Sequence, residues 1–185
     1  MTKYRLEVEG PVGATRQRGQ EWRQRLEGLL RQSAPGDLVE VDLTALEAMS
    51  VSFADELIGR LLADRLTGDF QDRAIVILGS NDDVRETLEA VLERRDAGAL
   101  YRAGRKGAVQ ALAGPTWFRE TVEHANDLRV FRAHDLAERL HKSPQAVNNR
   151  LKQLAASGAV LRERGVPQGG GKEFTYRAAT AVTGR

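Results

Sequence analysis

The first hundred residues alternate between stretches with the period of a β-strand and stretches with the period of an α-helix. Residues 4–9 alternate apolar and charged side chains, residues 38–43 are apolar except for acids at 40 and 42, and residues 74–78 are apolar throughout. These patterns predict three strands, the last of them buried on both faces of a parallel sheet. Three helices are predicted from apolar residues at helical spacing, namely Trp22, Leu26, Leu29 and Leu30; Phe53, Leu57, Ile58, Leu61 and Leu62; and Val84, Leu88, Val91 and Leu92. This order predicts an α/β fold with a partly parallel sheet.

Local signals add boundaries to these elements. Ser52 is the predicted N-cap of the second helix, with Asp55 three residues on in an approximate capping box. Asp82 and Asp83 fall in the first turn of the third helix, where the helix dipole favours negative charge. The glycine-rich residues 98–115 predict a final edge strand followed by a linker.

After Pro115 the period is helical again, and the chain then ends in a predicted hairpin. Three short helices are predicted from their apolar residues, namely Phe118, Val122, Ala125 and Leu128; Leu136, Ala137 and Leu140; and Val147, Leu151 and Leu154. Ser143 and Pro144 begin the third of these as N-cap and first helical residue, and Gly158 ends it. Residues 159–162 and 173–177 form the predicted hairpin around a loop with several glycines.

The charge of the 185-residue chain is divided unevenly between two halves, each long enough for a small domain. Residues 1–114 carry 16 basic and 19 acidic side chains, whereas residues 115–185 carry 12 basic and 7 acidic ones. This asymmetry indicates that the second half faces a polyanion. The absence of cysteine excludes disulfides and thiolate metal sites, and no apolar run approaches the roughly 20 residues of a membrane span. We therefore expect a cytoplasmic protein without a membrane partner.

Three helices, a tight turn between the second and third, and a trailing hairpin predict a winged helix-turn-helix. The segment DLAERLHKSPQAVNNRLKQLAASG, residues 135–158, resembles bacterial winged-helix regulators in its spaced Leu-Ala, its Ser-Pro start, its Val and Leu stripe and its closing Gly. The resemblance implies that residues 113–185 form an α+β winged helix-turn-helix domain that binds double-stranded DNA.

The third helix of this domain has a polar side opposite its Val and Leu stripe. Asn and Gln can bond bidentately to adenine, and Lys can reach guanine or a phosphate. In the hairpin, basic side chains could contact phosphates or a minor groove. The candidate DNA-binding residues are Ser143, Gln145, Asn148, Asn149 and Lys152 on the helix, and Arg162, Arg164 and Lys172 in the wing. The alternative is that these are solvated polar residues on a winged helix that binds a protein.

The segment LVEVDLTALEAMSVSFADEL, residues 38–57, is similar to the STAS-like domains related to bacterial anti-sigma-factor antagonists. A strand ending in Asp-Leu-Thr, a loop, and a helix that begins at Ser-Phe-Ala-Asp-Glu carry the similarity. It implies an α/β STAS-like domain over residues 1–112, with this loop as its contact surface. The resemblance also makes a histidine-kinase-type ATPase, or another regulatory protein, an expected partner.

The candidate partner-binding residues are Ser50, Ser52, Asp55 and Glu56. Family antagonists are phosphorylated on a serine of this loop, but Val51 stands at the aligned position here. Ser50 or Ser52 could take its place, because phosphate at a helix N-terminus would alter docking. The alternative is that Ser52 serves only as an N-cap.

Catalysis has little support in the sequence. The three histidines, His124, His134 and His141, lack metal-ligand spacing, so we expect no metal, no cofactor and no enzymatic activity. The basic run of residues 102–106 is interpreted as a solvated linker, with phosphate contact as the alternative. We therefore expect a DNA-binding transcriptional regulator, dimeric on paired half-sites, whose STAS-like domain senses a partner or effector. The alternative is a non-enzymatic partner-switching adaptor or antagonist whose winged helix docks protein.

Overall fold

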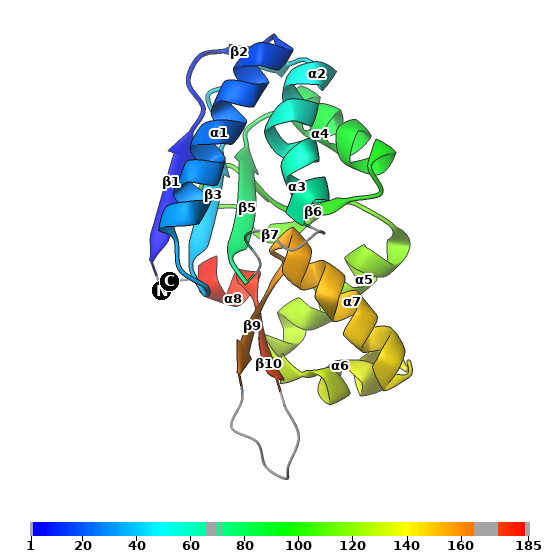
Figure 1. The fold of residues 1–185 in the computed structure, drawn as a ribbon. Coiled ribbons are helices and arrows are strands. Elements are labelled where there is room, and N and C mark those ends of the chain that lie inside the picture. The colour runs from blue at the N-terminus through cyan, green and yellow to red at the C-terminus, as the bar shows by residue number, and fades with distance from the viewer. Residues whose placement is uncertain (1, 66–69, 71, 165–173, 184–185) are drawn as a thin grey trace.

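A mixed five-stranded sheet lies at the centre of the fold in the computed structural model, which describes residues 2–65, 70, 72–164 and 174–183 (Figure 1). The strand order is β1-β3-β5-β6-β7. The first four strands in this order run parallel, and β7 pairs antiparallel with β6. The bounds are β1, Lys3–Glu7; β3, Leu38–Asp42; β5, Ala74–Gly79; β6, Gly98–Ala103; and β7, Val109–Ala113. The sequence therefore predicted the α/β class and the partly parallel sheet correctly.

Helices from the first half of the chain cover one face of this sheet (Figure 1). They are α1, Arg16–Gln32; a continuous helical segment made of α2, Val51–Ala54, the π-helical turn η1, Asp55–Gly59, and α3, Arg60–Arg65; and α4, Asp82–Arg94. A two-stranded pair, β2 at Val12–Gly13 and β4 at Ala48–Met49, lies beside the start of α2. The side chain of Asn81 caps the amino end of α4. Asp82 and Asp83 occupy the first turn of this helix, as predicted.

The apolar strand β5 contributes to two hydrophobic clusters because its side chains alternate between the faces of the sheet. Ile75 and Ile77 pack with α1, α2 and α4 on one face. Val76 and Leu78 face the other way and pack with side chains from the second half of the chain. The prediction that this strand is buried on both faces is thus confirmed, and its second face is covered by residues that lie beyond position 115.

Residues 98–115 form two paired strands, β6 and β7, where the sequence predicted one edge strand and a linker. The basic run between them is tied to the sheet as well. Arg102 bonds the buried Glu40 at 3.3 Å, and Arg105 lies 3.0 Å from Asp42. The interpretation of this run as a solvated linker was wrong, because its arginines pair with acids on β3 that lie about 60 residues earlier in the chain.

In the part that the structure describes, the second half of the chain contains four helices and a three-stranded antiparallel sheet of order β8-β10-β9. The bounds are α5, Thr116–Leu128; β8, Val130–Arg132; α6, Ala133–Leu140; α7, Pro144–Ser157; β9, Val160–Arg164; β10, Phe174–Ala178; and α8, Ala179–Thr183. The three predicted helices and both strands of the predicted hairpin are present. The short elements β8 and α8 were not predicted. The glycine-rich loop of the hairpin lies outside the described residues.

One hydrophobic cluster joins the two halves of the chain. Leu38, Val76 and Leu100 from the large sheet are in the same cluster as Phe118 of α5 and Leu154 of α7. All five are at most 3% exposed. The large sheet is therefore a layer between the amino-terminal helices and the carboxyl-terminal half. Among the described residues, no helix has both the length and the apolar character needed to cross a membrane.

Candidate functional site

The face of α7 that points away from the core carries four candidate DNA-binding side chains. Val147, Leu151 and Leu154 are fully buried on the inner face. The outer face presents exposed polar residues, namely Gln145, Asn148, Asn149 and Lys152. None of these four has a hydrogen bond or ion pair with another side chain in the described part of the protein. The structure thus places them together, on one exposed surface, as the periodicity of the helix predicted.

Both ends of α7 are fixed by the residues that the sequence assigned to them. The Ser143 hydroxyl accepts a hydrogen bond from the Ala146 amide at 3.3 Å, so this candidate residue acts as the N-cap. Gly158 ends the helix in the left-handed conformation with φ of 79°. A Cβ at Gly158 would lie only 2.8 Å from the backbone nitrogen of Ile75. The carboxyl end of α7 is therefore held against β5, and its amino end projects away from the large sheet (Figure 1).

Arg150 sets the rotation of α7 about its axis. Its Nη1 donates to Glu120 at 2.8 Å and to the Thr121 hydroxyl at 3.0 Å, both on α5. The guanidinium also lies 5.8 Å from the centre of the Trp117 ring. The hydrogen bond from Arg150 lowers the pKa of Glu120 below its usual range. Local sequence patterns could not indicate this role, because the partners lie about 30 residues earlier in the chain.

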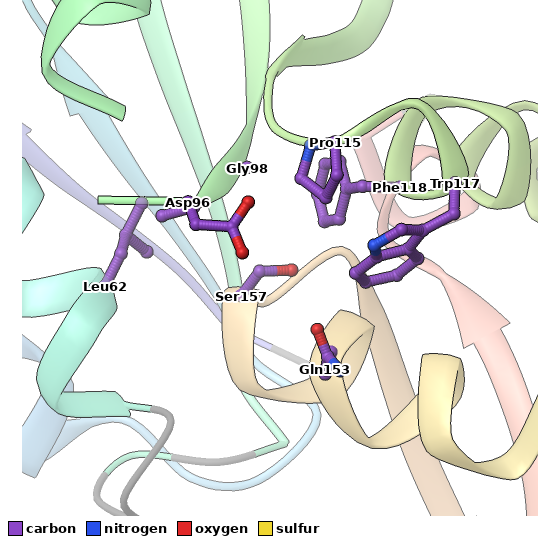
Figure 2. Close-up of a pocket in the computed structure, with 9 residues that line it drawn as sticks. Leu62, Asp96, Gly98, Pro115, Trp117, Phe118, Gln153 and Ser157 are labelled. Carbon is purple, nitrogen blue, oxygen red and sulfur yellow. The ribbon is translucent and has the colours of Figure 1, made fainter. Parts of the chain in front are cut away.

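A small cavity of about 30 Å³ marks the contact between α7 and the segments around it, enough space for a single water molecule. Figure 2 shows Gln153 and Ser157 of α7 on one side and Trp117 of α5 and Asp96 before β6 on the others. This cavity is too small for an organic ligand. It therefore belongs to the packing of α7 against its neighbours.

Arg162 is the one wing candidate whose side chain lies among the described residues. Arg162 forms an ion pair with Asp72 at 3.3 Å, and its guanidinium lies 5.0 Å from the centre of the Phe174 ring. Arg162 thus links the hairpin to the amino-terminal half in place of the predicted open position. The side chain of Arg164 and the whole of Lys172 lie outside the described residues.

The candidate partner-binding residues gather at the start of the α2 helix, but the N-cap differs from the prediction. Ser50 is the cap, because its hydroxyl accepts from the Phe53 amide at 3.1 Å and donates to the Ala14 carbonyl at 2.7 Å. Ser52 lies in the first turn, with its hydroxyl 3.1 Å from that of Ser50. The helix begins two residues early because β4 pairs with β2 and leaves Ser50 as the last extended residue.

Glu56 is buried and is not available to a partner. It is 3% exposed and has three arginines around it, Arg16 at 3.4 Å, Arg60 at 3.2 Å and Arg23 at 3.9 Å. The prediction that Glu56 forms part of a contact surface was therefore wrong. The physical reason is the approach of α1, whose Gly19 lies so close that a Cβ there would be 3.0 Å from Glu56 Cβ.

An open hollow of about 720 Å³ lies at the start of α2, and Asp55 forms part of its wall. Arg95 holds Asp55 with two hydrogen bonds of 2.6 and 2.8 Å. The hydrogen bonds lower the pKa of Asp55. The other residues of the wall are Arg16, Ser50, Val51, Ser52 and Arg94. Three of the four predicted residues thus share one surface. The arginines that complete it were missed because two of them, Arg94 at the end of α4 and Arg95 directly after it, lie about 40 residues further along the chain.

Asp55 and Glu56 lie in η1, where the helix widens into a π-helical turn. Such turns are rare and are frequent at functional sites. Among the described residues, no group of three or more His, Asp or Glu side chains could hold a metal ion.

Comparison with known proteins gives no match, either to a family model or to a curated protein. The two resemblances stated from the sequence therefore remain predictions. The exposed face of α7 and the hollow at α2 are the surfaces where the candidate residues from the sequence gather.

Proposed function

We propose that this protein is a DNA-binding transcriptional regulator. In this proposal residues 113–185 are a winged helix-turn-helix, with α7 as the recognition helix in the major groove. Residues 1–112 are a STAS-like domain that receives a signal from a protein partner or an effector. The order of helices α5, α6 and α7, followed by the β9–β10 hairpin, supports this reading of the second half.

The observation that carries the proposal is the row of unpaired polar side chains on α7. Gln145, Asn148 and Asn149 lie in its first six residues, and Lys152 follows one turn later. Recognition helices contact base edges through their amino-terminal residues. Amides are suited to adenine and lysine to guanine or phosphate, each good pair contributing roughly 1–3 kcal/mol of discrimination. The carboxyl end of α7 is buried, so only its amino end is free to enter a groove. This supports an orientation in which the amino-terminal residues contact the bases.

Fluorescence anisotropy with genomic DNA fragments tests the proposal. We expect binding that weakens steeply as salt rises, since phosphate contacts release counterions. Asn149→Ala combined with Lys152→Ala should weaken binding to one sequence about 100-fold, at roughly 1–3 kcal/mol for each lost contact. The matched control is Gln20→Ala with Gln24→Ala, which removes two exposed amides from α1 and should leave binding unchanged. Absence of binding at low salt contradicts the proposal.

A partner-switching adaptor is the second candidate, and the hollow at α2 favours it. Val51 is 43% exposed there, beside the hydroxyls of Ser50 and Ser52. Val51 together with the hydroxyls and arginines of the hollow offers a partner both apolar and polar contacts, as protein interfaces do. The predicted partner is a histidine-kinase-type ATPase. Affinity purification that recovers such an ATPase with wild-type protein and loses it with Val51→Glu, without nucleic acid, would favour the adaptor.

A further inference from the structure

A second opening, separate from both surfaces above, lies between the two halves of the chain. It is a cleft of about 450 Å³ where the β6–β7 turn meets the end of α5 and the start of α8. This volume is within the usual range for small-molecule sites. Both halves line it, with Arg102 and residues 105–109 on one side and Asn126, Arg129 and Thr180 on the other.

The wall of this junction cleft is basic, and none of the described residues that form it is acidic. Its four cations are Arg102, Arg105, Lys106 and Arg129. The first two are paired with acids of the sheet behind them, Arg102 with Glu40 and Arg105 with Asp42 and Glu7. Lys106 and Arg129 are exposed and form no ion pair or side-chain hydrogen bond within the described residues. The cleft therefore keeps at least two positive charges without counter-charges.

Arg102 supplies a buried donor that has no acceptor. The residue is only 6% exposed. Its Nη1 bonds Glu40, but its Nε has no hydrogen-bond partner among the described residues. A buried donor without an acceptor costs free energy, and Arg102 is one of the residues that line the cleft.

Arg129 is held in a backbone conformation that is rare for any residue except glycine. Its φ is 62° and its ψ is −59°, close to the strained γ-turn. The surrounding structure enforces it, because the Arg129 amide donates to Ala125 at 3.0 Å and its carbonyl accepts from Ala178 at 2.8 Å. Enforced strain of this kind is concentrated at ligand-binding and switch sites. Here it presents the Arg129 side chain to the cleft.

We propose that the junction cleft binds a small phosphorylated ligand, with Lys106 and Arg129 holding the phosphate from opposite sides. Donors from two separate elements match a phosphate, which carries more charge and more acceptor oxygens than a single carboxylate. Asn126 adds an amide, since its Oδ1 lies 2.7 Å from the Thr180 hydroxyl and its Nδ2 is left to donate.

Isothermal titration of the full chain with inorganic pyrophosphate, in the absence of DNA, tests the site. We expect saturable binding with one ligand per chain. Lys106→Gln should weaken binding about tenfold, and Lys106→Gln with Arg129→Gln about 100-fold, at roughly tenfold for each charged hydrogen bond. Lys106→Gln alone decides the question if the double variant fails to fold, because Lys106 is exposed and unpaired.

The matched control is Arg119→Gln with Lys142→Gln, which removes the same charges from exposed positions outside the cleft and should change the affinity less than twofold. Equal weakening in this control, or no saturable binding to the wild type, overturns the proposal. Loss of binding in Arg94→Gln but not in Lys106→Gln also overturns it, because the ligand would then lie in the hollow at α2.

A role for the ligand in regulation rests on the proposed function. If residues 113–185 bind DNA, a ligand that bridges the β6–β7 turn and α5 should alter that affinity at constant ionic strength, and Lys106→Gln should abolish the change. Titration without DNA measures the site alone, so failure of DNA binding and failure of the junction cleft are distinguishable.

Discussion

Gly158, directly after α7, lies against Ile75 at the start of β5, so closely that a Cβ on Gly158 would be 2.8 Å from the Ile75 amide nitrogen. This contact joins the exposed helix of the second half to a central strand of the first half. The φ of 79° at Gly158 ends α7 and turns the chain into β9 in the same step. Two independent constraints therefore act on one residue, and both require glycine.

Gly158→Ala should reduce the free energy of unfolding by about 2–4 kcal/mol, because it adds a backbone clash to the cost of positive φ for a residue with a Cβ. Urea denaturation followed by circular dichroism measures the change. Gly36→Ala is the matched control, since Gly36 has φ of 92° but open space around its Cβ position. Gly36→Ala should reduce the free energy of unfolding by only about 1 kcal/mol, because it adds the cost of positive φ without a clash. Equal losses would show that the Ile75 contact is not tight.

Arg150 and Lys152 lie two residues apart on α7, but their substitution should affect different properties. Loss of Arg150 should reduce stability, whereas loss of Lys152 should reduce DNA binding. Arg150→Ala should lower the free energy of unfolding by about 1–2 kcal/mol, because it leaves Glu120 and Thr121 without their donor. Lys152→Ala should change stability by less than about 0.5 kcal/mol and should instead weaken DNA binding. Thermal unfolding and anisotropy on both variants separate the two roles. A DNA defect in folded Lys152→Ala equal to that of Arg150→Ala would mean that both act through helix position.

Acid should destabilise the fold through Glu40. Burial alone would raise the pKa of Glu40, but hydrogen bonds from Lys3 and Arg5 outweigh it and hold the pKa below its usual range. A lowered pKa in the folded state stabilises the protein above the unfolded-state pKa of about 4.3, and this contribution is lost as the pH falls below it. Urea denaturation at pH 7 and at successively lower pH measures how steeply the free energy of unfolding falls with pH.

Glu40→Gln should lower the free energy of unfolding at pH 7 by about 3 kcal/mol, because it leaves the buried Arg102 without its anion. The same variant should also show a shallower loss of stability in acid. Glu47→Gln, at an exposed position, is the control for removal of one carboxylate. If the two variants have identical pH profiles, Glu40 is not the group that titrates.

The two serines at α2 should differ in their contribution to stability. Ser50→Ala removes the helix cap and the bond to Ala14, and should reduce the free energy of unfolding by about 1–2 kcal/mol. Ser52→Ala should cost less than about 0.5 kcal/mol, because Ser52 caps no backbone amide. The same urea titration on both variants measures the difference, and a larger effect of Ser52→Ala would assign the cap to Ser52.

Hydrophobic periodicity was sufficient to predict the long elements of this fold. Leu26, Val76 and Leu154 are all fully buried, at positions where the spacing of apolar residues predicted a core. The strand β8 was missed because three residues with only Phe131 buried carry too little pattern. The strand β7 was missed because it follows a glycine-rich turn that also fits a linker.

The charged contacts could not be predicted, since they depend on which elements meet in space. Glu56 resembles a solvated first-turn acid in the sequence, and only the close approach of Gly19 on α1 shows that it is covered. Arg105 reaches Glu7 across 98 residues of sequence. Local patterns identify which side chains are polar, but tertiary packing decides which of them remain free to bind.

The shared hydrophobic cluster has a consequence for how a signal could travel through this protein. Because the second face of the large sheet is covered by α5, α7 and the β9–β10 pair, separating the two halves would expose apolar side chains to water. The halves should accordingly melt in a single cooperative transition, and either one expressed alone should aggregate. A signal received by the first half would then reach α7 without a hinge between the halves. The whole protein would change its tilt relative to the molecule that α7 binds.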